Sequence, residues 1–192
     1  MTDAWLVVGL GNPGPDYAAH RHSVGHRVID SLAEQIGEKP KRHKSIAMVA
    51  EGRFQSGTDR VILATLMCFM NVSGGPIGQL AKFFGIDPDH VIVIHDDVDL
   101  PFDTVRIKAG GGHGGQNGVR STIDHIGAEF LRVRVGVGRP AGQKDTAAHV
   151  LEPFTKVERE TLPNLIADAA GAVESIVLEG LAQAQLRYHS PS

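Results

Sequence analysis

The residues of this chain that are best suited to chemistry lie in four short polar motifs. Three of these motifs follow apolar, strand-like runs, and a glycine-rich run completes the set. Because ligands of open α/β sheets bind at the carboxyl ends of the strands, we expect one pocket to collect all four. The motifs are Gly9-Leu10-Gly11-Asn12-Pro13-Gly14 with Arg21-His22, Phe69-Met70-Asn71-Val72-Ser73-Gly74, His95-Asp96-Asp97-Val98-Asp99-Leu100-Pro101, and Gly110-Gly111-Gly112-His113-Gly114-Gly115-Gln116-Asn117-Gly118.

His22 and Asp96 have the residue types and positions that general-base chemistry needs. A carboxylate can accept one ring N–H of a histidine, which fixes the tautomer and leaves the other nitrogen to take a proton from water. Asn12, Asn71 and Asn117 add neutral donors that could hold an amide carbonyl or an oxyanion. Since no G-x-S-x-G nucleophile elbow is present, we expect water to be the nucleophile. Spacing alone leaves open that His22 and Asp96 are ordinary surface residues.

Two cofactor interpretations compete with this hypothesis. His20, His22 and His26, and the run from His95 to Asp99, contain metal-ligand types, but ten histidines make chance clusters common. The first motif also has G-x-G-x-x-G spacing, yet Pro13 and Pro15 delay the helix that should begin at the glycines of a dinucleotide site. We therefore predict neither a metal nor another cofactor, and we expect these glycines to allow close approach of a ligand or a neighbouring loop.

Length, cysteine content and net charge limit the number of domains, the cellular location and the mode of nucleic-acid binding that we expect. The 192 residues suit one domain, and Cys68 as the sole cysteine excludes an intramolecular disulfide, which favours a cytoplasmic location. We expect no targeting leader and no apolar stretch approaching the roughly 20 residues of a membrane span. A net charge of −3 argues against non-specific coating of nucleic acid. A local phosphate-binding stripe is still expected from Arg106, Lys108, Arg132 and Arg134, which recur at strand-like alternation.

The pattern of apolar residues predicts an α/β fold, a single domain over residues 1–192 with a twisted mixed β-sheet flanked by helices. Ser23 is expected to cap the first helix and Ser73 the second, with Gly37 and Gly85 ending them. Strands are expected at 5–9, 46–54, 60–67, 91–95, 104–108 and 131–137, and helices at 24–36, 76–84, 119–126, 157–169 and 172–186.

Taken together, the four motifs and the run 132–138 resemble the bacterial-type peptidyl-tRNA hydrolase family. The resemblance covers residues 7–138 in order and spacing, and the remainder only in its helical character. It implies hydrolysis, without a cofactor, of the ester between a peptide and the terminal ribose of tRNA. By the same resemblance His22 is the base that activates water, Asp96 orients it, and Asn12 distinguishes an N-blocked aminoacyl group from a free amino acid.

The resemblance also implies how the substrate is held. The side chains expected to contact the substrate end are Tyr17, Phe69, Asn71 and Asn117. Phosphates of the tRNA acceptor stem are expected to bind Lys108 and Arg134, with Arg106, Arg132 and Lys144 as helpers.

At two positions the chain departs from a common form of the family, since Ser23 stands where asparagine is frequent and Gln116 where histidine is frequent. Gln116 cannot titrate, so a second ionisable group at that position is not expected to assist. The expected partner is peptidyl-tRNA, bound by its acceptor stem and 3′ end, with no membrane, no obligate protein partner and a monomeric state. The alternatives are a non-catalytic RNA-binding module on the same fold and a metal-dependent hydrolase, which a chelator would inactivate.

Overall fold

The computed structural model describes residues 3–188 and places all of its strands in one mixed sheet. The order across the sheet is β2-β3-β4-β1-β5-β7-β6, with β4, β1, β5 and β7 parallel to one another and the remaining neighbours antiparallel. The predicted α/β class is confirmed. The strands are β1 (Ala4–Gly9), β2 (Lys41–His43), β3 (Ala47–Gly52), β4 (Arg60–Leu66), β5 (Val91–Asp97), β6 (Val105–Ala109) and β7 (Leu131–Gly136).

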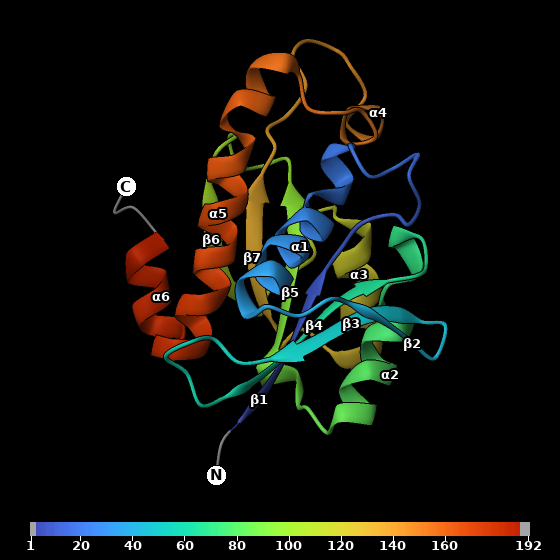
Figure 1. Cartoon of the computed structure of the whole chain (residues 1–192). Helices are drawn as coiled ribbons and strands as arrows, with labels where there is room; N and C mark the ends of the chain where they lie inside the picture. The colour runs from blue at the N-terminus through green and yellow to red at the C-terminus, as the bar shows by residue number, and fades with distance from the viewer. Residues whose placement is uncertain (1–2, 189–192) are drawn as a thin grey trace.

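Helices cover both faces of the sheet (Figure 1), because successive strand residues point to opposite sides. In β1, Val7 packs in the core under α1 and α5, whereas Leu6 and Val8 pack in the core under α2 and α3. The α-helices are α1 (Val24–Ile36), α2 (Gly74–Phe84), α3 (Asn117–Ile126), α4 (Thr146–Val150), α5 (Lys156–Glu179) and α6 (Leu181–Tyr188), and the short 3-10 turns are η1 (Arg21–Ser23), η2 (Met70–Val72) and η3 (Pro88–His90).

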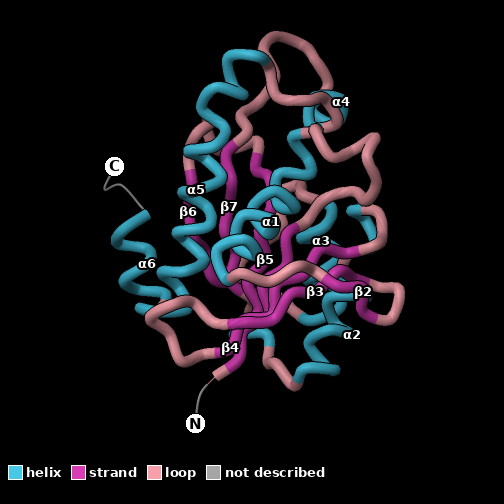
Figure 2. Tube along the Cα trace, viewed as in Figure 1, coloured by secondary structure: helices cyan, strands magenta, loops and turns pink. Residues whose placement is uncertain are grey.

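The chain crosses from one side of β1 to the other, since β4 and β5 both pair with it in parallel. The loops that follow β1, β4 and β5 therefore meet at one end of the sheet, which is the switch point where ligands bind in such folds. Figure 2 shows the strands, in magenta, side by side through the middle of the molecule, with loops, in pink, at their ends. The fold thus brings the first three polar motifs together, as predicted.

Two glycines of the first motif, Gly9 and Gly11, allow helix α1 to pack closely against the loop after β1. A Cβ at Gly9 would stand 2.1 Å from the Gly25 carbonyl oxygen, and one at Gly11 would stand 2.8 Å from the His26 ring. The close approach expected from a ligand or a neighbouring loop is made at these two glycines by helix α1. Helix α1 lies directly on the end of β1, and this contact fixes where the turn η1 begins.

Gly9→Ala is expected to destabilise the fold by about 1–3 kcal/mol, because the added methyl must push the α1 backbone away from β1. Denaturant unfolding would measure the loss. The matched control is Gly78→Ala in α2, where the new Cβ meets only Ile126 at 3.6 Å and should be neutral or mildly stabilising. Equal stability of both variants would contradict this account of Gly9.

Several element predictions need correction. The two C-terminal helices expected at 157–169 and 172–186 are instead α5, which is continuous through Gly171, and the short α6. Gly171 is explained by packing, since a Cβ there would stand 2.4 Å from the Tyr188 hydroxyl. Ser23 and Ser73 do not cap their helices through their side chains. Gly37 and Gly85 do end α1 and α2 in the left-handed conformation, as predicted.

Helix α5 also corrects the expectation that no apolar stretch is long enough to span a membrane. Its 24 residues pass that test by length and composition, and half of its most apolar 18-residue window is buried. The buried residues, including Leu162, Leu165 and Val173, pack in the core against α1, β6 and β7. This is the environment of a core helix in a globular protein.

The last helix packs along the outer strand β6. The Gln185 side-chain amide donates to the Ile107 carbonyl at 3.3 Å, and the Arg106 guanidinium donates to the Tyr188 carbonyl at 3.3 Å. Arg106 is therefore directed toward α6, and its expected role as a helper in phosphate binding stays a prediction.

Candidate active site

His22 and Asp96 are brought together from opposite ends of the first hundred residues. His22 lies in η1, immediately before α1, and Asp96 lies near the carboxyl end of β5. His22 Nδ1 is 2.8 Å from Asp96 Oδ2, and the side chains are 13% and 3% exposed. Because the carboxylate oxygen accepts, Nδ1 donates and Nε2 keeps its lone pair. The tautomer is therefore the one that can take a proton from water.

The environment of His22 adjusts its basicity in two opposite directions. Burial lowers its pKa, but the negative charge of Asp96 and the hydrogen bond to it raise the pKa by more, so the net value lies above the usual 6.5. The ring is consequently a stronger base than an ordinary histidine. It acts as a base only above this raised pKa, where it is neutral.

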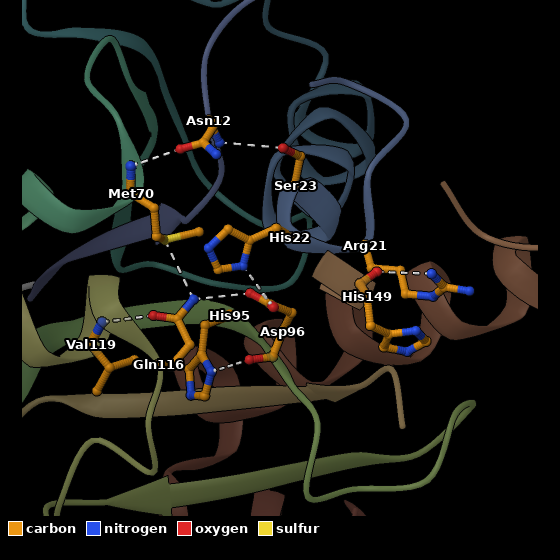
Figure 3. Close-up of polar contacts among 10 residues, drawn as sticks. All are labelled: Asn12, Arg21, His22, Ser23, Met70, His95, Asp96, Gln116, Val119 and His149. Atoms are coloured by element: carbon orange, nitrogen blue, oxygen red, sulfur yellow. Dashed lines mark hydrogen bonds and ion pairs between the residues drawn. The ribbon is translucent and has the colours of Figure 1, made fainter. Parts of the chain in front are cut away.

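Gln116 holds the second oxygen of Asp96. Its Nε2 donates to Asp96 Oδ1 at 2.9 Å, and its Oε1 accepts from the Val119 backbone N–H at 2.9 Å. Gln116 is the N-cap of α3, so the aspartate is fixed to the start of a helix by a group that does not ionise. Figure 3 shows the line of contacts from His22 through Asp96 to Gln116 and Val119. From the sequence Gln116 stood out only because histidine is frequent at its position, and its contact with Asp96 was not predicted.

Asn12 is held on two sides. Its Oδ1 accepts from the Met70 backbone N–H at 2.8 Å, and its own backbone N–H donates to Ser23 Oγ at 3.3 Å. The Ser23 hydroxyl expected as a helix cap is thus used to fix the loop after β1. Since Oδ1 is already bonded, the amide Nδ2 is the group of Asn12 that can donate to a substrate carbonyl.

A cavity of about 530 Å³ lies in front of these groups. This volume suits a small ligand or the end of a larger one. The predicted residues Asn12, His22, Phe69, Asn71, Asp96 and Asn117 all line it, together with Met70, His95, Asp97, Val98, His113, Gly114, Gly115, Gln116, Thr146, Ala147, Val150 and Leu151.

Tyr17 is not among the residues that line this cavity. Its ring contacts the edge of Phe69, with centroids 5.7 Å apart, and also the ring of His20 at 5.6 Å. Phe69 itself is 54% exposed. Tyr17 therefore supports an exposed aromatic ring at the cavity rim.

The predicted basic stripe separates into residues with different surroundings. Arg106 pairs with Arg134, and Lys108 with Arg132, across β6 and β7. Lys108 is exposed, and Arg134 Nε donates to Asp97 Oδ2 at 2.8 Å. Both line a smaller cavity of about 140 Å³ that shares His95, Asp97, His113 and Gly114 with the first. The positions expected to bind phosphate thus adjoin the main cavity.

Two other expected helpers are engaged within the protein. Arg132 is buried, donates to the carbonyls of Gly111 and Gly112, and lies over the Phe130 ring at 4.5 Å. It therefore shapes the glycine-rich loop. Lys144 forms an ion pair with Glu152.

Two other parts of the site were predicted differently or not at all. His95, considered only as a metal ligand, is buried, with Nδ1 donating to the Asp96 carbonyl at 2.8 Å, and burial lowers its pKa. Helix α4, which supplies the cavity residues Thr146, Ala147 and Val150 and is followed directly by Leu151, was not predicted. The signal available was Asp145, whose side chain accepts from the Ala147 N–H as an N-cap.

The histidines considered as metal ligands point to different places. His20 contacts Tyr17, His22 bonds to Asp96, and His26 lies against Gly11, where burial lowers its pKa to about 4. Over residues 3–188, no group of three or more histidine, cysteine, aspartate or glutamate side chains is arranged to hold a metal ion.

A histidine base oriented by a buried carboxylate, beside neutral amide donors, is the arrangement of a hydrolytic site that uses activated water. The model of the peptidyl-tRNA hydrolase family matches residues 6–192. A peptidyl-tRNA hydrolase from Arthrobacter sp. (strain FB24) is 54% identical over 191 residues, covering 99% of this chain and 98% of the relative. One from Leifsonia xyli subsp. xyli is also 54% identical over 191 residues, covering 99% of each.

A solved structure agrees with these sequence comparisons. The crystal structure of peptidyl-tRNA hydrolase from Acinetobacter baumannii superposes with a TM-score of 0.90 and 34% identity, covering 99% of this chain and 96% of that one. The chain belongs to the peptidyl-tRNA hydrolase family.

Proposed function

We propose that this protein hydrolyses the ester bond that joins a peptide, or another N-blocked aminoacyl group, to the 3′-terminal ribose of tRNA. The observation that carries the proposal is the 2.8 Å hydrogen bond between His22 and Asp96 at the wall of a cavity lined by three asparagines, in a chain of this family. The products are a free peptide and a tRNA ready for reuse, and cytoplasm is the expected location.

In the proposed mechanism, His22 Nε2 takes a proton from water as the water oxygen attacks the ester carbonyl carbon. The charge of Asp96 stabilises the imidazolium that forms, and Gln116 keeps the Asp96 carboxylate in place. The histidine then returns the proton to the departing ribose oxygen, so the base is regenerated without a cofactor.

The asparagines supply recognition in this scheme. Asn12 Nδ2 donates to the carbonyl of the peptide bond that distinguishes a blocked substrate from a free aminoacyl group. Asn71 and Asn117 line the cavity and are the donors proposed for the ester end of the substrate. Phe69 gives apolar surface at the rim for varied peptide side chains, and Tyr17 supports Phe69.

The test compares N-acetyl-aminoacyl-tRNA with free aminoacyl-tRNA, each with and without a chelator. We expect rapid, chelator-resistant release from the blocked substrate alone. Binding of tRNA without release would favour the RNA-binding module, and loss of activity with chelator, restored by metal, would favour a metal-dependent hydrolase.

Lys108→Ala is expected to weaken tRNA binding and to reduce its dependence on salt. Removing one phosphate contact should lower the slope of log affinity against log salt by roughly 0.7–0.9. The measurement is a binding titration of deacylated tRNA at several salt concentrations. Lys82→Ala, an exposed lysine at the end of α2, is the matched control. The same slope for Lys108→Ala and the parent would remove Lys108 from the phosphate site.

A further inference from the structure

Arg21, the residue before His22, is a buried cation whose contacts lie outside the proposed reaction. It is 4% exposed, and its guanidinium lies 5.8 Å from the centre of the Phe154 ring. Nη2 donates to Glu158 Oε1 at 2.9 Å, and Nη1 donates to the His149 carbonyl at 2.9 Å. A buried charge is costly unless it is paired and hydrogen-bonded, and the contacts of Nη1 and Nη2 supply that pairing here.

The backbone on either side of Arg21 is tied to the same distant segment. The Arg21 N–H donates to the Glu152 carbonyl at 3.0 Å, and His20 forms an antiparallel bridge with Pro153. The turn η1, which carries His22, is therefore attached to residues 149–158 by both side-chain and main-chain contacts. These partners are separated from it by more than 120 residues of sequence.

Glu158 gives this attachment a rigid base. It is the N3 residue of α5, where its carboxylate accepts from the Thr155 N–H at 2.9 Å while its own N–H donates to Thr155 Oγ1 at 3.1 Å. This capping box fixes the start of a 24-residue helix that packs in the core through Leu162 and Leu165. The Arg21 guanidinium therefore binds to the first turn of α5, which has little freedom to move.

The attached segment begins in α4, which with Leu151 forms a wall of the main cavity. Thr146, Ala147, Val150 and Leu151 line the cavity, and the His149 carbonyl that Arg21 binds belongs to the same helix. Figure 3 shows consecutive side chains diverging, with His22 toward Asp96 and Arg21 toward His149. The Arg21 side chain thus links the turn that carries His22 to this wall of the cavity.

We propose that Arg21, through its ion pair with Glu158, is a positioning residue that holds His22 against Asp96 and at a fixed spacing from the wall formed by α4. This inference rests on the proposed function, because its effect is read in the hydrolysis rate. Other ionisable groups around the His22 ring are His95 and Asp97 from β5 and His113 from the glycine-rich loop, all lining the same cavity.

The test uses Arg21→Met, which keeps the length of the side chain but removes its charge and donors, and Arg21→Lys, which keeps the charge. With N-acetyl-aminoacyl-tRNA we expect Arg21→Met to lower kcat by 10- to 100-fold and Arg21→Lys to recover part of that loss. Arg187→Met is the matched control, because it breaks the exposed Arg187–Glu179 pair at the far end of α5. Its kinetics should match the parent.

The pH profile separates positioning from simple electrostatics. Loss of a nearby positive charge alone would raise the pKa of His22 and move the acid limb of kcat/KM to higher pH. Loosening of the His22–Asp96 contact moves the limb to lower pH, toward the ordinary histidine value, and this is the result expected for Arg21→Met. The double variant Arg21→Met with Glu158→Gln should cost no more in kcat than Arg21→Met alone, since both act through one contact.

Circular dichroism and thermal unfolding would establish that each variant is folded at the assay temperature. If Arg21→Met does not fold, Arg21→Lys and Glu158→Gln carry the same test, with smaller losses in kcat and the same direction of the acid limb. A folded variant with the kcat and acid limb of the parent, or a limb moved upward, would overturn the positioning role. Inactivity of the parent protein would instead reject the proposed function.

Discussion

His22→Ala is expected to abolish hydrolysis of N-acetyl-aminoacyl-tRNA, with a loss of at least about 10³-fold in the single-turnover rate. The ring nitrogen opposite the Asp96 contact is the proposed acceptor for the proton of water, and alanine offers no substitute. Binding of tRNA should change little, because Lys108 and Arg134 lie in the adjoining cavity. The measurement is a quenched time course with the enzyme in excess over substrate.

His90→Ala is the matched control for this experiment. His90 lies in η3, before β5, and contacts Asp3 and Asp89 at the opposite end of that strand from Asp96. It should retain the parent rate. A folded His22→Ala protein that keeps full activity would remove His22 as the base.

Asp96→Asn is expected to lower kcat by about 10²–10⁴-fold while leaving the fold intact. The neutral amide no longer stabilises the imidazolium, and it can present an N–H where Nδ1 of His22 needs an acceptor. The size of the loss follows from the burial of this pair, since little solvent is available to replace the missing charge.

The pH dependence of the same variant has a definite sign. In the parent, activity falls as pH drops through the raised pKa of His22, above 6.5. Without the Asp96 charge only the effect of burial remains, so the pKa of His22 falls below 6.5 and the acid limb moves to lower pH. Asp103→Asn, an exposed position at φ 64° that asparagine adopts readily, is the control. An unchanged limb in Asp96→Asn would contradict the proposed pairing.

The elements that could be predicted from the sequence are those determined by neighbouring residues in the chain. Strand β1, the β3–β4 hairpin and the helices α1 and α2 follow from runs of apolar residues and from the glycines that end them. The short elements β2 and α4 were not predicted, because three to five residues give no measurable period. The helix break expected near Gly171 was wrong. Glycine is needed there because the hydroxyl of Tyr188 packs against it, and the local sequence pattern does not reveal that contact.

In the site, too, residues placed by their order along the chain were predicted, and contacts between distant segments were not. His22, Asp96 and the three asparagines stand at strand ends and loop junctions, where their positions relative to the sheet can be inferred from order along the chain. The contacts of Gln116 and Arg21 depend on how helix termini meet the sheet, across 20 and 137 residues of sequence. Ser23 is the clearest case of a contact that local sequence does not reveal. Its hydroxyl was expected to cap α1 and instead accepts a hydrogen bond from the backbone N–H of Asn12.

The position of α6 has a consequence for how copies of this chain behave when crowded together. An uncovered outer strand offers unpaired N–H and C=O groups to another molecule, and such strands seed edge-to-edge aggregation. Here α6 lies along β6, and its Gln185 side chain donates a hydrogen bond to the Ile107 carbonyl. The other outer strand, β2, is only three residues long and carries Lys41 and Arg42. One outer strand is therefore covered by a helix and the other is short and positively charged, so we expect neither to pair readily with a strand of another copy.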